Sequence, residues 1–181
     1  MKVEETALPG VLVLTPVVYG DHRGAFMETW NLRRMEEAGL PTTWVQDNFS
    51  ISKKNVLRGI HYQVTQPQGK LVRVAWGAVL DVAVDLRRSS AHFGRHVAVE
   101  LSEENGRMLW IPPGFGHGFL ALTETVGFSY KVTDYYSAAG ERTILWNDAD
   151  LGIAWPVDAV GAIVSEKDAQ GAKFAEAEVY A

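Results

Sequence analysis

In the stretch Asp81-Val82-Ala83-Val84-Asp85-Leu86-Arg87, branched apolar side chains alternate with small or charged ones. Val82, Val84 and Leu86 share one face, as the period of two in a β-strand requires. The same alternation recurs in residues 96–101 and in residues 128–133. These segments predict strands whose two faces differ in polarity.

Further strands are predicted for segments of similar composition, namely residues 11–18, 25–30, 43–52, 56–64, 70–76, 108–111 and 119–123. Turn signals such as Gly20-Asp21 and Pro112-Pro113-Gly114 separate them. Only two helices are expected, residues 31–38 after an Asn cap and residues 165–170 after a Ser cap. Many short strands with few helices predict a mainly β fold, either a sandwich or a barrel, with a jelly roll as the leading candidate.

The composition fits a single folded domain over residues 1–181 with a substantial core. Hydrophobic residues make up 47% of the chain, so disorder is not expected. The net charge is −5 and no run of Lys or Arg occurs, which argues against nucleic-acid binding. The absence of cysteine excludes disulfides and thiolate chemistry. Residues 1–6 lack an apolar signal core and no stretch is apolar enough to span a bilayer, so a cytoplasmic protein without a membrane partner is expected.

The segment Leu57-Arg58-Gly59-Ile60-His61-Tyr62-Gln63 carries the strongest candidate for catalysis, and Lys70 follows on the next strand. An imidazole suits proton abstraction at neutral pH, and the nearby cations suit an anionic ligand. A lone histidine on a strand is more often structural, but these neighbours favour a functional role. Strict alternation puts Arg58 and His61 on opposite faces, so both can line one site only if the strand bends or bulges at Gly59.

A second histidine, His117, follows Pro112-Pro113-Gly114 in a turn that enters a strand. It is either bonded to the loop backbone or a ligand of a substrate oxygen or phosphate. Residues 106–117 match most of the second cupin motif, a metal-binding half-site, but the first motif would need His-x-His and a carboxylate. This chain has His61, Gln63 and Gln68 there. Two histidines and two amides suit a divalent metal poorly, so we expect a cupin-type barrel without a metal.

Three tyrosines and one carboxylate complete the candidates. Tyr130 shares a strand face with apolar neighbours, so core packing and proton donation are both open. Tyr135 and Tyr136 are expected to pack in the core. Asp168 is either a solvated charge at a helix end or a carboxylate that orients His61.

Taken together, these segments resemble the dTDP-4-dehydrorhamnose 3,5-epimerase family. The matching stretches are residues 21–28, 46–52, 57–63, 69–72, 81–87, 111–119, 130–131 and 165–168. They cover nearly the whole chain in the family's order, without a departure at a position that the family uses for chemistry. The resemblance implies a cupin-type jelly-roll β-barrel with a few short helices and no cofactor. It also implies a homodimer that lends its N-terminal strand to the partner, and epimerisation at C3 and C5 of a 4-keto-6-deoxy dTDP-sugar on the way to dTDP-L-rhamnose.

The resemblance also implies a role for individual residues. His61 would be the base with Asp168 as its partner, Tyr130 the acid on the opposite face, and Lys70 the cation that stabilises the enolate at O4. Residues implied to hold the sugar or diphosphate are Arg23, Arg58, His117 and Lys167, and those implied to frame the thymidine end are Phe26, Glu28, Gln46, Asn48 and Glu141. The residue types fit independently, because C3 and C5 flank the C4 ketone and lose a proton to give an enolate. An imidazole, an ammonium and a phenol are the minimal set for this chemistry, and NAD is not needed because the ketone is already present.

Two alternatives stay open from the sequence. A relative that epimerises only one of the two carbons would carry the same residues. A catalytically silent cupin that only binds a nucleotide sugar is the other, but such a binder has no need of the acid–base set formed by His61, Tyr130 and Lys70.

Overall fold

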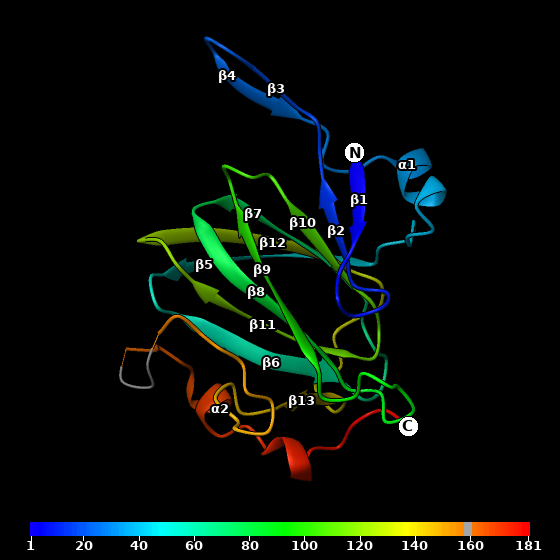
Figure 1. Ribbon diagram of the computed structural model, residues 1–181, viewed down its shortest axis with the longest axis vertical. Helices are drawn as coiled ribbons and strands as arrows, with labels where there is room; N and C mark the ends of the chain where they lie inside the picture. The colour runs from blue at the N-terminus through cyan, green and yellow to red at the C-terminus, as the bar shows by residue number, and fades with distance from the viewer. Residues whose placement is uncertain (158–160) are drawn as a thin grey trace.

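In the computed structural model, which describes residues 1–157 and 161–181, two antiparallel β-sheets face each other and enclose the core (Figure 1). The six-stranded sheet runs in the order β1 (Lys2–Glu5), β2 (Leu12–Thr15), β10 (Met108–Ile111), β7 (Lys70–Trp76), β12 (Thr125–Val132) and β5 (Gln46–Lys53). The five-stranded sheet runs in the order β13 (Glu141–Thr143), β6 (Leu57–Gln63), β11 (Phe115–Ala121), β8 (Ala78–Asp85) and β9 (His96–Ser102). The mainly β fold predicted from alternation is confirmed.

Both faces of the five-stranded sheet are covered, and this decides where its polar residues lie. Val82, Val84 and Leu86 pack into a cluster with residues of the C-terminal segment, on the outside of the barrel. Ala83, on the opposite face of β8, belongs to the cluster between the two sheets. Since side chains alternate along a strand, the carboxylate of Asp81 is directed toward the barrel interior, and it is fully buried.

The helices are few and short, as predicted. Helix α1 (Leu32–Glu37) begins after Asn31, whose side chain accepts a hydrogen bond from the backbone of Arg34. Helix α2 (Glu166–Ala169) begins after Ser165, and a single 3-10 turn, η1 (Phe174–Glu176), follows it. Figure 1 shows α2 and η1 beneath β6, at the end opposite the N-terminal strands. Among the described residues, none of the helices is long and apolar enough to cross a bilayer.

The N-terminal region differs from its prediction. Residues 11–18 were predicted as one strand, but only Leu12–Thr15 form β2, and β3 (Val18–Asp21) begins at the last residue of the range. Pro16 lies between the two strands and lacks the N–H that a ladder needs. The apolar strand β2 pairs with β1 and with β10 of its own chain. The strands β1 and β13 are short and were not predicted.

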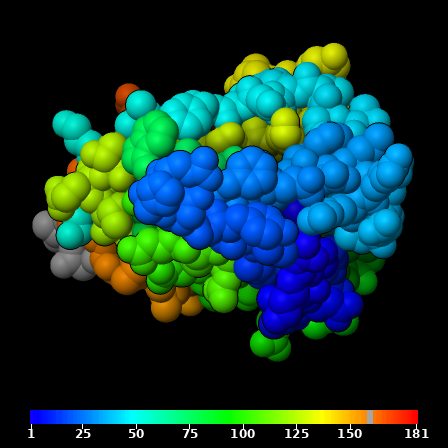
Figure 2. All heavy atoms as spheres, turned by 90° about the horizontal axis from the view of Figure 1, so that it is seen from above, coloured from blue at the N-terminus to red at the C-terminus, as the bar shows by residue number. Residues whose placement is uncertain are grey.

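A two-stranded hairpin, β3 with β4 (Gly24–Met27), stands apart from both sheets. Figure 1 shows it projecting beyond the barrel, and Figure 2 shows it from that end, next to the segment that holds α1. Its aromatic side chains are in the open, since Tyr19 is 65% exposed and Phe26 is 70% exposed. Large exposed aromatic groups on a projecting arm are typical of a surface that meets another molecule.

Candidate active site

A cavity of about 290 Å³ lies inside the barrel between the two sheets. Its lining combines bases, cations and aromatic rings, contributed by Asn48, Phe49, Ser50, Arg58, His61, Lys70, His117, Phe119, Phe128 and Tyr130. The structure thus brings together six residues singled out in the sequence: Asn48, Arg58, His61, Lys70, His117 and Tyr130. The sequence did not flag the apolar side of the cavity, where the rings of Phe119 and Phe128 stack with centroids 4.2 Å apart.

Arg58 and His61 both line this cavity, although regular pleating would direct them to opposite faces. The register of β6 against β11 shifts here, so that Gly59 and Ile60 together face the single residue Gly118. Gly59 has φ 126°, and a Cβ on it would lie 2.5 Å from Gly118 Cα. No side chain fits in that space, and the bulge that glycine permits resets the alternation. The predicted bulge is confirmed.

His61 forms a close pair with a carboxylate from α2. Its Nε2 lies 2.5 Å from Oδ1 of Asp168, whose side chain is almost completely buried. The hydroxyl of Ser165 accepts from the backbone N–H of Asp168, which fixes the start of the helix. Burial alone would raise the pKa of Asp168, but the hydrogen bonds from His61, Ser165 and the Gly59 N–H together bring that pKa below its usual value. An ionised Asp168 therefore accepts from His61 Nε2, and the lone pair stays on Nδ1.

His117 has a carboxylate partner of its own. Its Nε2 lies 3.1 and 3.0 Å from the two carboxylate oxygens of Asp81, and both residues are buried. Burial lowers the pKa of His117, even though Asp81 opposes this, so the imidazole is neutral at pH 7. A turn is present at Pro113 and Gly114 as predicted, but His117 lies within a strand rather than in the turn, because β11 (Phe115–Ala121) already begins at Phe115. Asp81 was not predicted as a site residue, but a carboxylate inside an otherwise apolar strand was the signal for it.

Lys70 is the buried cation of the cavity. Burial lowers its pKa to about 8, against the opposing charges of Asp81 and Glu141. Within the described part of the chain, no residue accepts a hydrogen bond from its ammonium group. That group is therefore available to a ligand oxygen.

Tyr130 belongs to the opposite sheet from His61. It lies on β12, between Val72 of β7 and Asn48 of β5. Burial raises the pKa of its phenol, so the group stays protonated at neutral pH and able to donate. On β5, Gln46 donates to Asn48 at 2.8 Å, which orients the amide that lines the cavity.

Comparison with known proteins agrees with this geometry. The family model for dTDP-4-dehydrorhamnose 3,5-epimerase matches residues 5–176. The dTDP-4-dehydrorhamnose 3,5-epimerase of Pseudomonas aeruginosa is 51% identical over 181 residues, which cover 99% of this chain and 99% of that one. This chain belongs to the dTDP-4-dehydrorhamnose 3,5-epimerase family. It is therefore an isomerase, as the sequence predicted.

Two solved structures are similar to this one in fold. The 3,5-epimerase of Legionella pneumophila in complex with dTDP-4-keto-L-rhamnose superposes with a TM-score of 0.94 at 45% identity, covering 98% of this chain and 94% of that chain. A 3'-monoepimerase of Streptomyces bikiniensis in complex with dTDP-quinovose gives a TM-score of 0.88 at 34% identity, covering 94% and 86%. The cupin-type barrel predicted from the sequence is confirmed by the first of these.

In this epimerase, two further predicted residues meet at α2, next to Asp168. Lys167 forms an ion pair of 2.5 Å with Glu141, and the hydroxyl of Tyr136 donates to the same carboxylate at 2.8 Å. Burial would raise the pKa of Glu141, but these two partners bring it below its usual value. Tyr136 and its neighbour Tyr135 are 56% and 59% exposed, so the prediction that they pack in the core is wrong. They lie in the loop between β12 and β13 rather than on a strand.

Among the predicted residues that do not line the cavity of their own chain, three lie in the N-terminal region. Arg23 and Phe26 lie on the projecting hairpin, where Arg23 is bound to the carboxylate of Asp21. Glu28 accepts from Asn31 and pairs with Arg34, beside α1. A single chain therefore leaves this set apart from the catalytic candidates.

The amides at the cupin ligand positions of this epimerase have structural partners. The Gln63 amide donates to the carbonyl of Gln66 at 2.7 Å and accepts from the backbone N–H of Ser137. Gln68 donates to the carbonyl of Asp134. Both amides thus tie the loop after β12 to the barrel. Over residues 1–157 and 161–181, no group of three or more His, Cys, Asp or Glu is placed to hold a metal ion.

Proposed function

We propose that this chain inverts C3 and C5 of dTDP-4-dehydro-6-deoxy-D-glucose and yields dTDP-4-dehydro-L-rhamnose, a step of dTDP-L-rhamnose biosynthesis. The observation that supports it most directly is the placement of His61 and Tyr130 on opposite sheets of one cavity, with Lys70 in the same lining. Inversion of a carbon needs a base on one face and an acid on the other. The ligand named for the Legionella pneumophila relative, dTDP-4-keto-L-rhamnose, belongs to the same reaction.

In the proposed mechanism, His61 removes the proton from C3 or C5. The electrons of that C–H bond form a double bond to C4, and the ketone oxygen becomes an enolate oxygen. Lys70 donates a hydrogen bond to this oxygen, where the charge develops. Tyr130 then gives its phenolic proton to the other face of the carbon, which restores the C4 ketone. Solvent returns a proton to Tyr130 and accepts the one held by His61, so no redox cofactor is needed.

The carboxylate of Asp168 gives His61 its role as a base. It accepts the Nε2–H, which leaves the lone pair on Nδ1, and it stabilises the imidazolium that forms when His61 takes a proton. We expect Nδ1 to be the atom that accepts the proton.

Cations around the cavity suit the rest of the nucleotide sugar. Arg58 lines the cavity and is steadied by the Ser52 hydroxyl, which accepts from its Nε at 3.1 Å. A guanidinium held in this way suits a diphosphate oxygen. We assign a different partner to His117. Its Nε2–H is given to Asp81 and its imidazole is neutral, so Nδ1 is an acceptor that fits a sugar hydroxyl better than a phosphate.

We propose further that two chains form a homodimer in which the hairpin of one completes the site of the other. Arg23 and Phe26 stand on an arm that projects from the barrel, away from the cavity of their own chain (Figure 1). Exposed Tyr19 and Phe26 give this arm an apolar surface that a second copy would cover. Arg23 would then face the diphosphate of the neighbouring site and Phe26 its thymidine.

Sedimentation at micromolar concentration tests the dimer and should give twice the 20.0 kDa chain mass. Subunit mixing tests the shared site. A chain with His61→Asn and a chain with Phe26→Ala should each be weakly active alone. Heterodimers of the two contain one site with an intact base and an intact hairpin, so activity should return to about a quarter of the wild-type level in a random mixture. Fully active monomers, or no recovery on mixing, would contradict the shared site.

The reaction itself is tested by incubating the protein with dTDP-4-keto-6-deoxyglucose in deuterated water. The proposal expects deuterium at both C3 and C5, with inverted configuration at each carbon. Exchange at one carbon alone would identify a monoepimerase instead, a possibility favoured only by the likeness to the Streptomyces bikiniensis monoepimerase. No exchange at either carbon would refute both.

A further inference from the structure

The carboxylate of Asp81 is a buried charge of the barrel interior to which the proposed mechanism gives no part in proton transfer. It lies on β8 opposite Phe119 of β11, and its side chain has no exposed surface. Its partner is the Nε2–H of His117, which both of its oxygens accept at 3.0 to 3.1 Å. A carboxylate carried into a barrel interior costs several kcal/mol unless a cation or several donors compensate it.

We propose that Asp81 is a positioning residue of the reaction. In this role it keeps Lys70 in its ammonium form and holds His117 in one tautomer. The inference rests on the proposed function, because the charge of Lys70 matters only if an enolate forms beside it.

The charged groups around Lys70 come from several elements, and the anions among them differ in their partners. The charges that act on Lys70 are those of Asp81 on β8, Glu141 on β13 and Lys167 on α2. The other titratable or charged side chains that line the same cavity are Arg58, His61, His117 and Tyr130. Glu141 is already neutralised by Lys167 at 2.5 Å and by the Tyr136 hydroxyl. Asp168 is engaged by His61. Among the described residues, no Arg or Lys forms an ion pair with Asp81, whose partner is His117. The carboxylate of Asp81 is therefore the remaining counter-charge for the ammonium group of Lys70.

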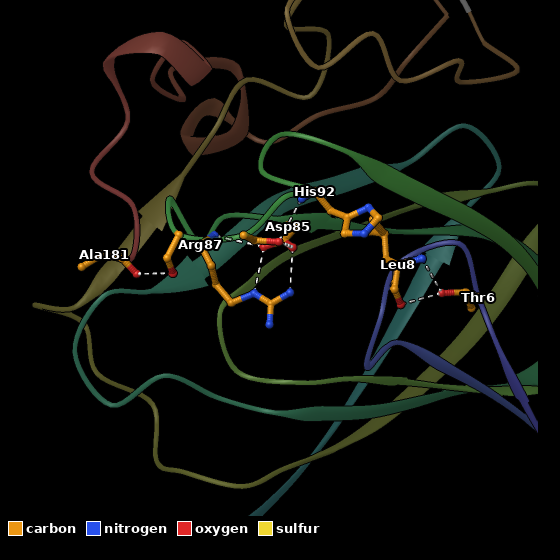
Figure 3. Close-up of polar contacts among 8 residues, drawn as sticks. Thr6, Leu8, Asp85, Arg87, His92 and Ala181 are labelled. Carbon is orange, nitrogen blue, oxygen red and sulfur yellow. Dashed lines mark hydrogen bonds and ion pairs between the residues drawn. The ribbon is translucent and has the colours of Figure 1, made fainter.

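Asp85, a second carboxylate on the same strand, differs from Asp81 because its charge has structural partners only. Asp85 is also fully buried, but Arg87 donates to both of its oxygens at 2.9 and 2.7 Å (Figure 3). The hydroxyl of Ser90 donates to the same carboxylate at 2.6 Å. The charge of Asp85 is therefore compensated within its own turn, outside the cavity lining. Asp81 has no such cation of its own, and its imidazole partner lines the cavity.

The consequence of this arrangement is chemical. Burial brings the pKa of Lys70 down to about 8, and the charge of Asp81 is the largest of the influences that hold it up. If that charge is removed, Lys70 loses its proton at lower pH, and the enolate loses its hydrogen-bond donor. The same carboxylate holds the Nε2–H of His117, so it also decides which ring nitrogen is left to accept from a ligand.

The test is the pH dependence of kcat for Asp81→Asn, with Asp85→Asn as the matched control. Asparagine keeps the shape and can still accept from His117, so this variant removes mainly the charge. The alkaline limb of kcat, set by Lys70, should move to lower pH by roughly one unit, and kcat at pH 8 should fall about fivefold with a smaller change in KM. Asp85→Asn should lower Tm without moving the limb. A limb that stays in place in Asp81→Asn would overturn the inference.

If Asp81→Asn does not fold alone, Lys70→Met supplies a second background. Removing both buried charges together should restore folding, so Asp81→Asn should lower Tm less beside Lys70→Met than beside the wild-type lysine. Equal losses of Tm in the two backgrounds would refute the coupling. Failure of the inference is distinct from failure of the proposed function, because wild-type protein that does not epimerise the sugar refutes the function before any variant is made.

Discussion

His61 Nε2 lies 2.5 Å from Asp168 Oδ1, although 107 positions separate the two residues in the chain. The short helix α2 carries the carboxylate, which is not part of the cavity lining, so the imidazole is oriented from outside the cavity. Replacing Asp168 with Asn keeps an acceptor but removes the charge that stabilises the imidazolium. We expect kcat to fall by about 100-fold while Tm changes little. The control is Glu166→Gln, an exposed change on the same helix, which should leave kcat near wild type. Equal activity in both variants would contradict the role of Asp168.

Replacing Tyr130 with Phe should separate proton removal from proton return. The ring that packs beside Phe128 is kept, and only the donor is lost. His61 should still exchange the C3 and C5 protons, so deuterium from solvent should enter with retained configuration while inverted product falls by about 100-fold or more. NMR of the recovered sugar in deuterated water measures both outcomes. Inverted product formed at the wild-type rate would exclude Tyr130 as the acid.

Gly59→Ala should damage both stability and activity. A Cβ there would lie 2.5 Å from Gly118 Cα and 2.8 Å from the carbonyl of His117, at a backbone φ of 126°. We expect a loss of about 3 kcal/mol in the free energy of unfolding, since both strain and overlap act. Gly24→Ala is the matched control, because its φ is 129° with no atom within 4 Å, and it should cost about 1 kcal/mol. Chemical denaturation measures the free energy of unfolding of both variants. Equal losses in the two would show that the close approach of Gly59 to β11 is unimportant.

Lys70 should make stability and activity respond to pH in opposite directions. Its pKa is about 8 in the folded protein against an ordinary value of 10.5, so the unfolded chain binds more protons between these pH values. The stability of wild type relative to Lys70→Met should therefore rise by about 3 kcal/mol between pH 7 and pH 10.5. Over the same range kcat should fall, because the ammonium is the active form. Parallel urea titrations of the two proteins measure the difference, and a flat difference would show that Lys70 is not perturbed.

Much of the fold could be predicted because local sequence features mark its elements, namely alternation along the strands, turn residues between them and caps at the helices. The caps Asn31 and Ser165 placed both helices, and β7 and β10 were predicted with the bounds that the structure gives. The faces were harder to assign. In β8 the side with Val82 and Val84 packs under the C-terminal segment, and the side with Asp81 and Ala83 faces the barrel interior, so both faces of this strand are buried. Alternation alone reports two different faces without telling which one is inside.

The site could be predicted only in part, for a physical reason. The bulge at Gly59 was inferred from the conflict in parity between Arg58 and His61, since glycine is the residue that permits it. The role of Asp81 and the exposure of the loop with Tyr135 were not inferred from the sequence. Burial at both places depends on contacts between segments that are distant in the chain. The roles of the site residues, the single domain over residues 1–181, the homodimer, the absence of a metal and the cytoplasmic location stay predictions.

His61→Asn, incubated with dTDP-4-keto-6-deoxyglucose in deuterated water, tests the central claim most directly. Asparagine roughly preserves the shape of imidazole but cannot accept the proton, so exchange at C3 and at C5 should both fall by about 100- to 10,000-fold. Binding of dTDP should change little, because His61 is not assigned to the nucleotide. If the variant still exchanges both positions at a rate near wild type, His61 is not the base and the proposed mechanism is wrong.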